Sequence, residues 1–234
     1  MNGVVRLTPH SSMFEGLSRL RDLGFSPTSI LDVGAYEGQF SRGARQIWKD
    51  AYIFMIDALL EKEPMLASAC RELGNADHLI AMLGQREMEA ASFFVVDTEL
   101  RPDLVKTGSS KFRENTAFPM NERALPQRTL DSVVIDCGRS FQLLKLDVQG
   151  AELEVLKGFG RHLPNIEVIL MEMSLVEYNK GAPLIDVMLG ELRRMDFVLY
   201  DIVEEQRYGG RLFQLDGLFV RPTSRFRPQP PFWS

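Results

Sequence analysis

The chain has 234 residues, of which 45% are hydrophobic and 25% are charged, as is typical of a globular protein. Its net charge of −5 argues against nucleic acid as the main partner, because binding to phosphates needs a basic surface. The two cysteines give neither a disulfide framework nor a metal-ligand spacing. The sequence suggests no signal peptide and no membrane span, so we expect a cytoplasmic protein.

The predicted elements alternate between helix and strand, beginning with a helix over residues 12–23 that a capping box of Ser12 and Glu15 introduces. Strands are then predicted at 29–33, 52–57, 77–83, 91–97, 142–147, 166–173, 197–203 and 212–220, and helices at 39–49, 61–73, 151–158 and 184–196. This alternation predicts a parallel sheet with helices on both faces. The polar stretch 204–210 ends in two glycines, so the last two strands should form an antiparallel hairpin.

A glycine turn follows the first predicted strand, where Gly34 and Gly38 bracket three residues. Glycine has no Cβ, so a ligand can approach the backbone closely, and the turn indicates a nucleotide-like cofactor at the head of the sheet. A dinucleotide fingerprint would need G-x-G-x-x-G, but Tyr36 occupies the middle position. The spacing therefore disfavours a nicotinamide-dependent oxidoreductase. A plain tight turn without a ligand remains the alternative.

A carboxylate ends the second predicted strand. Asp57 stands about 20 residues beyond Gly38, the spacing expected of an acid that binds the two hydroxyls of a ribose. Alternatively, Asp57 caps the helix that begins near Glu61. We favour the ribose interpretation because the glycine turn precedes this carboxylate.

Two stretches interrupt the alternation of helix and strand. Residues 98–127 form a long polar segment with three prolines, and we interpret this segment as a lid over a substrate. The alternative is a surface insertion without a role. Residues 222–234 are rich in arginine and proline and should form an extended tail. We therefore expect a single domain over residues 1–221, followed by this tail.

A third motif, residues 143–158, is the most specific one in the chain. It combines a strand, an acid, a glycine turn and a helix, and together with the first turn it resembles the FkbM family of S-adenosylmethionine (SAM)-dependent methyltransferases. The hallmark of that family is K-[IL]-D-[VI]-[EQ]-G-x-E-x-x-V-L-x-G. The matching residues are Lys145, Asp147, Gln149, Gly150, Glu152, Val155, Leu156 and Gly158. Further matches follow in chain order at 32–36 with Gly38, 108–110, 113–115, 129–131, 170–173, 214–216 and 219–220.

The resemblance spans roughly residues 12–221, and the chain departs from the family at two places. The family usually has a Glu-Pro pair where this chain has Asp57 and Ala58, and the shorter aspartate keeps the carboxylate. The hallmark often has glutamate where Gln149 stands. Glutamine removes one charge from the site, which weakens the argument for a base at this position.

The resemblance implies an α/β fold of the Rossmann-like class I methyltransferase type. In this fold a mostly parallel seven-stranded central sheet with an antiparallel last strand carries helices on both faces. The resemblance also implies SAM as the cofactor. The expected cofactor-binding residues are Asp32, Gly34, Ala35, Tyr36, Glu37, Gly38, Asp57, Ala58, Met82, Leu83 and Asp147. The expected acceptor-binding residues are Ser109, Ser110, Arg113, Glu114 and Gln149.

Carboxylates follow several predicted strands at the edge of the sheet where ligands bind in open α/β folds. We expect Asp147 and Glu172 to be catalytic, with one of them accepting the proton of the acceptor. The alternatives are a helix cap for Asp147 and a paired strand end for Glu172. A magnesium ion held by both residues together with Glu152 is a further alternative, although we predict no metal site.

The function that the resemblance implies is SAM-dependent O-methyl transfer to a hydroxyl of a small-molecule acceptor, either a sugar or a secondary metabolite. Three other functions stay open. They are methyl transfer to a carboxyl group, SAM binding without catalysis by a protein that acts as an interaction partner, and, least favoured, the oxidoreductase. A homodimer is a further expectation. We interpret the three histidines, His10, His78 and His162, as surface or structural residues.

Overall fold

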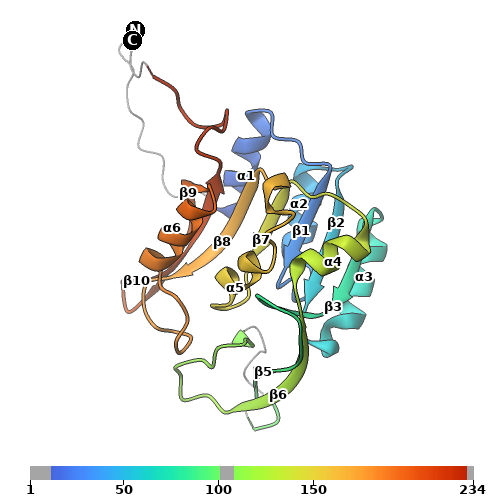
Figure 1. Ribbon diagram of the computed structural model, residues 1–234, viewed down its shortest axis with the longest axis vertical. Coiled ribbons are helices and arrows are strands. Elements are labelled where there is room, and N and C mark those ends of the chain that lie inside the picture. The colour runs from blue at the N-terminus through green and yellow to red at the C-terminus, as the bar shows by residue number, and fades with distance from the viewer. Residues whose placement is uncertain (1–11, 101–107, 231–234) are drawn as a thin grey trace.

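The computed structural model describes residues 12–100 and 108–230 and contains a seven-stranded sheet in the order β3-β2-β1-β7-β8-β10-β9 (Figure 1). The strands are β1 (Ser29–Val33), β2 (Tyr52–Asp57), β3 (Ala76–Ile80), β7 (Leu143–Leu146), β8 (Val168–Ser174), β9 (Val198–Tyr208) and β10 (Arg211–Val220). The first five strands in the sheet order are parallel. Strand β10 runs antiparallel to both β8 and β9. This topology confirms the predicted fold class, including the hairpin of the last two strands.

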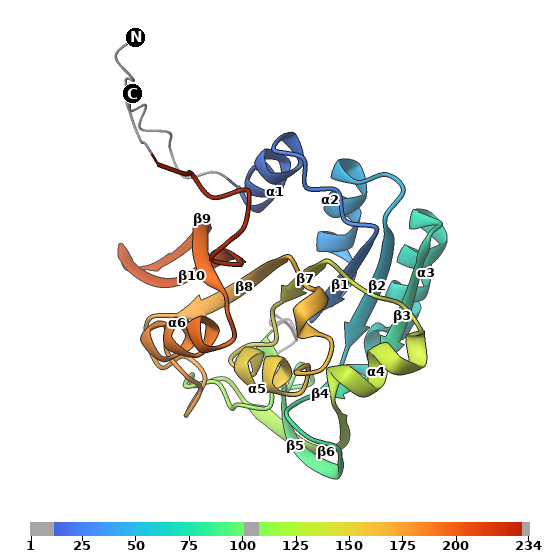
Figure 2. The same ribbon diagram turned by 45° about the horizontal axis from the view of Figure 1, so that its top comes forward.

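Helices cover both faces of the sheet (Figure 2). The helices on one face are α1 (Met13–Asp22), α2 (Gln39–Ile47) and α3 (Glu63–Leu73), and those on the other are α4 (Leu130–Cys137), α5 (Glu152–Lys157) and α6 (Ile185–Arg194). Each set closes one hydrophobic core against the sheet. Every residue of β1 and β2 is buried, as expected of strands covered on both faces. In the part of the chain that is described, no helix is long and apolar enough to cross a membrane.

Helix α1 begins at the predicted capping box. The hydroxyl of Ser12 accepts a hydrogen bond from the N–H of Glu15 at 3.4 Å, and the Glu15 carboxylate accepts one from the N–H of Ser12 at 3.0 Å. The helix packs closely on β9, because a Cβ added at Gly16 would overlap the side chain of Val203. A residue without a side chain is therefore needed where α1 crosses the sheet.

A second, three-stranded sheet in the order β4-β6-β5 projects from one end of the molecule (Figure 1). Its strands are β4 (Met82–Leu83), β5 (Met88–Val96) and β6 (Met120–Arg128). The prediction of one strand over 77–83 is therefore wrong, because β3 belongs to the large sheet and β4 to the small one. The division falls at Ala81, whose N–H donates to the carbonyl oxygen of Asp57 at 2.8 Å before the chain changes sheets.

The segment 98–127 is not a continuous loop as predicted, because β6 begins at Met120 and pairs antiparallel with β5. Pro126 fits inside β6 because it lies at a shift of register between Met88 and Ala91 of β5, where a missing N–H breaks no regular ladder. Residues 120–128 lack the apolar run of a strand, so pairing with β5 decides their structure. Residues 101–107 lie outside the described residues.

One helix was not predicted from the sequence. This is helix α4, which Thr129 caps by accepting a hydrogen bond from the N–H of Ser132 at 3.2 Å. The tail is anchored to the domain, because Phe226 is buried against Phe25 with ring centroids 5.6 Å apart. Residues 231–234 of the tail lie outside the described residues.

Candidate active site

A pocket opens at the carboxyl ends of β1, β2 and β7, the edge of the sheet where ligands bind in open α/β folds. The space that protein atoms leave free here, including part of the open solvent at the mouth of the pocket, is about 770 Å³. Several residues predicted for the cofactor line it, namely Gly34, Tyr36, Asp57, Ala58, Met82, Leu83 and Asp147. Two residues predicted for the acceptor, Ser109 and Gln149, line it as well.

The glycine turn after β1 forms one wall of this pocket. Gly34 and Gly38 both have left-handed backbone conformations, with φ of +76° and +80°. The N–H groups of Gly34 and Ala35 donate to the carbonyl oxygen of Ile56 at 2.9 and 3.0 Å. A Cβ added at Gly34 would overlap the carbonyl oxygen of Asp147. Position 34 therefore needs glycine for the close approach of two strands, independently of any ligand.

Asp57 ends β2 at the pocket, and the backbone holds both of its carboxylate oxygens. The N–H of Tyr36 donates to Oδ2 at 2.8 Å and the N–H of Leu59 donates to Oδ1 at 2.9 Å. Tyr36 reaches this position with φ of +51°, a rare value for a residue other than glycine. Burial raises the pKa of Asp57, and the two hydrogen bonds oppose that rise. A carboxylate offers about four acceptor positions, so Asp57 can still accept from a ligand.

Three residues predicted for the cofactor, Ala35, Glu37 and Gly38, shape the turn without being among the lining residues. Glu37 accepts a hydrogen bond from the ammonium of Lys62 at 2.7 Å. The same ammonium lies 3.5 Å from the ring centroid of Tyr36. Lys62 therefore fastens the glycine turn to the segment that leads into α3.

Part of the pocket lining is apolar, with Met82, Leu83 and Leu59 among its walls. Phe93 of β5 and Lys111 also line the pocket, and Lys111 forms an ion pair with Glu154 of α5. Neither residue was predicted to line the pocket. Phe93 belongs to the small sheet, and Lys111 follows Ser110, which forms a β-bridge with Phe94 of β5. The family-like matches at 108–110 and 113–115, which flank Lys111, are the sequence signals for this segment.

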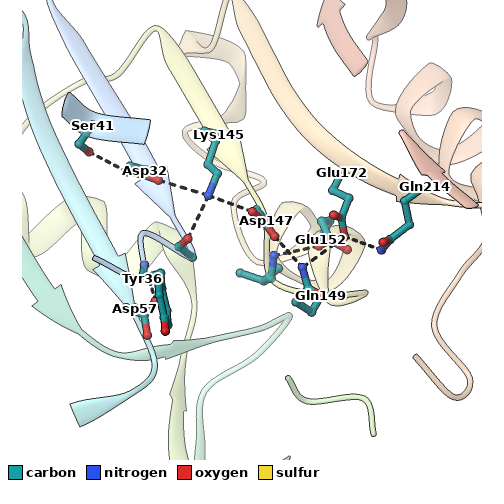
Figure 3. A network of polar contacts seen from close by, with 12 residues as sticks. Asp32, Tyr36, Ser41, Asp57, Lys145, Asp147, Gln149, Glu152, Glu172 and Gln214 are labelled. Atoms are coloured by element: carbon teal, nitrogen blue, oxygen red, sulfur yellow. Dashed lines mark hydrogen bonds and ion pairs between the residues drawn. The ribbon is translucent and has the colours of Figure 1, made fainter. Parts of the chain in front are cut away.

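A buried lysine connects β7 to the glycine turn (Figure 3). The ammonium of Lys145 donates to the carbonyl oxygen of Gly34 at 2.9 Å, and lies 3.5 Å from Asp32 and 3.4 Å from Asp147. Burial acts to lower the pKa of Lys145, but the two carboxylates outweigh it and raise that pKa. Asp32, predicted for the cofactor, is completely buried and also accepts from the hydroxyl of Ser41 at 2.6 Å. Lys145 thus positions both the turn and Asp147. This role was not predicted from the sequence, in which Lys145 appears only as a match to the family hallmark.

The two carboxylates predicted to be catalytic meet at one amide group (Figure 3). The amide of Gln149 donates to Asp147 at 2.8 Å and to Glu172 at 3.3 Å. Glu172 accepts two more hydrogen bonds, from Gln214 at 2.7 Å and from Gln206 at 3.2 Å. Burial, followed by the negative charge of Asp147, raises the pKa of Glu172 well above its ordinary value. Asp147 faces the pocket, while Glu172 lies deeper, with 8% of its surface exposed.

Glu152 has a structural role and does not join the pair formed by Asp147 and Glu172. Its carboxylate accepts from the N–H groups of Val148 at 2.9 Å and Gly150 at 3.2 Å, and so closes the turn before α5. Burial raises the pKa of Glu152 to about 7 against these hydrogen bonds. Within the described residues, Glu152 does not join Asp147 and Glu172 in a group close enough to share a metal ion. The alternative of a magnesium site here is therefore not supported.

The other residues predicted for the acceptor attach the segment after β5 to its neighbours. The hydroxyl of Ser110 donates to the carbonyl oxygen of Gln149 at 2.7 Å. Glu114 is buried against Gly108, and burial raises its pKa. Arg113 is exposed, and its carbonyl oxygen accepts from the backbone of the loop that follows β8. None of these three is among the residues that line the described pocket.

Asp216 of β10 is paired with Glu172 of β8. Replacing Asp216 by asparagine should stabilise the protein at alkaline pH. Burial and the charges of Asp147 and Glu204 raise the pKa of Asp216 to about 7, whereas in the unfolded chain it is about 3.9. Above pH 7 the folded state therefore bears the full cost of a buried charge, and this cost declines progressively as the pH falls from about 7 towards the unfolded pKa of about 3.9.

We expect Asp216→Asn to be more stable than the parent by about 1–3 kcal/mol at pH 8, and by much less at pH 5. Urea unfolding at the two pH values measures the difference. The control is Asp50→Asn, which changes an exposed loop residue and should shift stability by less than about 0.5 kcal/mol at either pH. Equal stability of Asp216→Asn and parent at pH 8 would show that Asp216 carries no such cost.

Comparisons with solved structures agree with this fold. The methyltransferase FkbM from Methylobacillus flagellatus KT superimposes with a TM-score of 0.52 at 15% identity, over 82% of this chain and 43% of that one. The N-terminal domain of EvdMO1 with SAH bound superimposes with a TM-score of 0.50 at 10% identity, over 91% and 82%. At these identities the likeness shows the fold alone. The chain spans less than half the length of the first structure.

A search of curated proteins finds no match to this chain. A family model described as the methyltransferase FkbM domain matches residues 32–199. This match covers well over half of the chain, and it contains the glycine turn, Asp57, Lys145 and the two carboxylates that meet at Gln149. The protein therefore belongs to the FkbM methyltransferase family.

Proposed function

We propose that this protein is a SAM-dependent O-methyltransferase whose acceptor is a hydroxyl of a sugar or of a secondary metabolite. The observation that carries the proposal is the pair of carboxylates, Asp147 and Glu172, beside a pocket walled by the glycine turn and Asp57. Methyl transfer to a hydroxyl requires a group that takes up the hydroxyl proton. The two carboxylates supply such a group next to the position proposed for the methyl donor.

The shape and polarity of the pocket support SAM as its ligand. The apolar lining residues Met82, Leu83 and Phe93 suit the adenine ring, while Asp57 suits the two ribose hydroxyls. The methionine part would then extend along Gly34 towards Asp147, because these residues line the remaining wall.

When bound, SAM supplies a methyl group on a sulfonium centre that is already electrophilic. The residues of the chain have two tasks, which are to align the acceptor oxygen with that methyl group and to accept its proton. Asp147 faces the pocket, and Lys145 holds it in place from behind. Burial raises the pKa of Glu172, so this carboxylate is a stronger proton acceptor than an ordinary glutamate once it is ionised.

Gln149 has a specific part in this arrangement. Its amide donates to both carboxylates, so it holds Asp147 and Glu172 at a fixed separation. A glutamate at this position, which is common in the family, would bring a third carboxylate to the same point. The glutamine thus favours two ionised or proton-sharing carboxylates, and it acts as a positioning residue rather than as a base.

Isothermal calorimetry and a transfer assay test this function. We expect binding of SAM and S-adenosylhomocysteine, no binding of NAD, and methyl transfer from labelled SAM to a member of a panel of sugars and phenolic alcohols. Transfer only to carboxylic acids would identify the acceptor as a carboxyl group. Binding of SAM without turnover on either class would indicate a non-catalytic partner protein. Tight binding of NAD without SAM would refute the assignment.

The variant Asp57→Ala identifies the part of the pocket that binds the ribose. Loss of a charged hydrogen-bond acceptor should weaken SAM binding by about 1–3 kcal/mol in the same calorimetric titration. Asp50→Ala removes an exposed carboxylate just before the other end of β2, and it should leave SAM affinity unchanged. If Asp57→Ala bound SAM as tightly as the parent, the ribose role of Asp57 would be wrong.

A further inference from the structure

Three metal-ligating side chains meet at the outer edge of the large sheet, away from the pocket. Cys70 lies on α3, and Asp77 and His78 lie on the edge strand β3. One ligand atom from each, the thiol sulfur, a carboxylate oxygen and an imidazole nitrogen, lies within 4.8 Å of the other two. None of the three is among the residues that line the described pocket, and the proposed methyl transfer does not involve them.

The separation of sulfur and nitrogen matches a known coordination geometry. The Sγ of Cys70 and the Nδ1 of His78 are 3.5 Å apart. A tetrahedral zinc ion, with bonds of about 2.3 Å to sulfur and about 2.0 Å to nitrogen, places these two ligands about 3.5 Å apart. The distance between these two donors is therefore the one that a shared zinc ion requires. The carboxylate oxygen of Asp77 lies within 4.8 Å of both donors, close enough to be a third ligand.

The surroundings suit an ion that enters from solvent. Cys70 and His78 are half-buried between helix and strand, whereas Asp77 is exposed at the rim. The backbone N–H of His78 donates to Asp77 Oδ1 at 2.8 Å, which keeps the carboxylate beside the imidazole. Thiolate, imidazole and carboxylate are each ligands that zinc binds, and water would supply the fourth position.

We propose that Cys70, Asp77 and His78 bind a zinc ion that links α3 to the edge strand β3. A free thiol is largely protonated near neutral pH, whereas zinc binds the thiolate. On binding, the S–H bond breaks, the Zn–S bond forms, and one proton passes to solvent. The ion would thus fix an edge of the sheet beside β2, the strand that ends at Asp57.

Cobalt titration of the full chain tests this site, since Co²⁺ substitutes for zinc and reports its ligands by absorption. We expect a thiolate-to-cobalt charge-transfer band and tetrahedral visible bands at one ion per chain, both removed by added Zn²⁺. Calorimetry of Zn²⁺ in two buffers of different ionisation enthalpy should give a release of about one proton per ion. At a Zn²⁺ concentration 100 times the Kd, the melting temperature should rise by about 5–10 °C.

Variants of the proposed ligands identify which residues bind the ion. Cys70→Ser should abolish the charge-transfer band and the rise in melting temperature, and His78→Gln should weaken cobalt binding at least tenfold. Cys137→Ser, the matched control, changes the other half-buried cysteine and should leave both signals unchanged. Circular dichroism without metal checks that each variant is folded. Absence of a charge-transfer band in the parent, or its persistence in Cys70→Ser, would overturn the proposal.

Discussion

Replacing Gly34 by alanine is expected to destabilise the protein by about 2–5 kcal/mol and to abolish SAM binding. Two costs add at this position. A left-handed backbone costs a residue with a side chain about 1–2 kcal/mol, and a methyl group forced into a closely packed position costs about 1–3 kcal/mol more. The methyl group would overlap the carbonyl oxygen of Asp147, so relief of the clash must move the backbone of a pocket residue.

Gly138→Ala provides the matched control. Gly138 also has a left-handed conformation, with φ of +67°, but a Cβ there would meet no atom within 4 Å. Gly138→Ala should therefore lower the free energy of unfolding only by the cost of the left-handed backbone, about 1–2 kcal/mol, and leave SAM binding intact. Urea unfolding measures the stability of both variants, and calorimetry measures their affinity for SAM. If Gly34→Ala were no less stable than Gly138→Ala, the close approach of β1 and β7 would not constrain the turn.

Removing the charge of the proposed base should have the largest effect on rate. Asp147→Asn and Glu172→Gln keep the shape of each side chain, and loss of a general base lowers turnover by about 10²–10⁴-fold. We expect at least one of the two variants to show this loss in a single-turnover assay with saturating SAM. SAM affinity should remain within a few-fold of the parent for Glu172→Gln, because Glu172 is not among the residues lining the pocket.

The pH dependence of turnover distinguishes the two carboxylates. Burial favours the protonated form of Glu172 and raises its pKa, and a base acts only when it is ionised. If Glu172 is the base, turnover rises with pH through this raised pKa, and Glu172→Gln removes the rise. Glu167→Gln, at the exposed opposite end of β8, should behave like the parent. Full activity of both Asp147→Asn and Glu172→Gln would leave alignment alone as the source of catalysis.

The sequence by itself determined the large sheet and most of the pocket. The apolar runs of β1, β2 and β7 predict buried strands because they are covered on both faces, and a carboxylate or a glycine marks the end of each. Carboxyl ends of parallel strands meet at one edge of a sheet, so the order of the motifs along the chain is enough to predict that Gly34, Asp57 and Asp147 share a site. The ordered motifs also predicted the family, which the family model confirms.

Only the tertiary structure decided what depends on contacts between distant segments. Strand β6 has no apolar run and forms because β5 pairs with it, so the predicted loop proved to be partly a strand. The same small sheet brings Phe93 and Lys111 to the pocket, whereas Glu114 is turned into the protein.

The tertiary structure also decides the electrostatic environment of the ionisable groups, because the protonation state of each group depends on its burial and on its neighbours in space. The motif contains Lys145, but its contacts with Asp32 and with the carbonyl oxygen of Gly34 arise from the pairing of β1 with β7. Cys70 and His78 lie eight residues apart on different elements, and only the packing of α3 on β3 brings them within 3.5 Å. Local patterns predict most strands and helices of the large sheet, while side-chain partners are set by the sheet order and by helix packing.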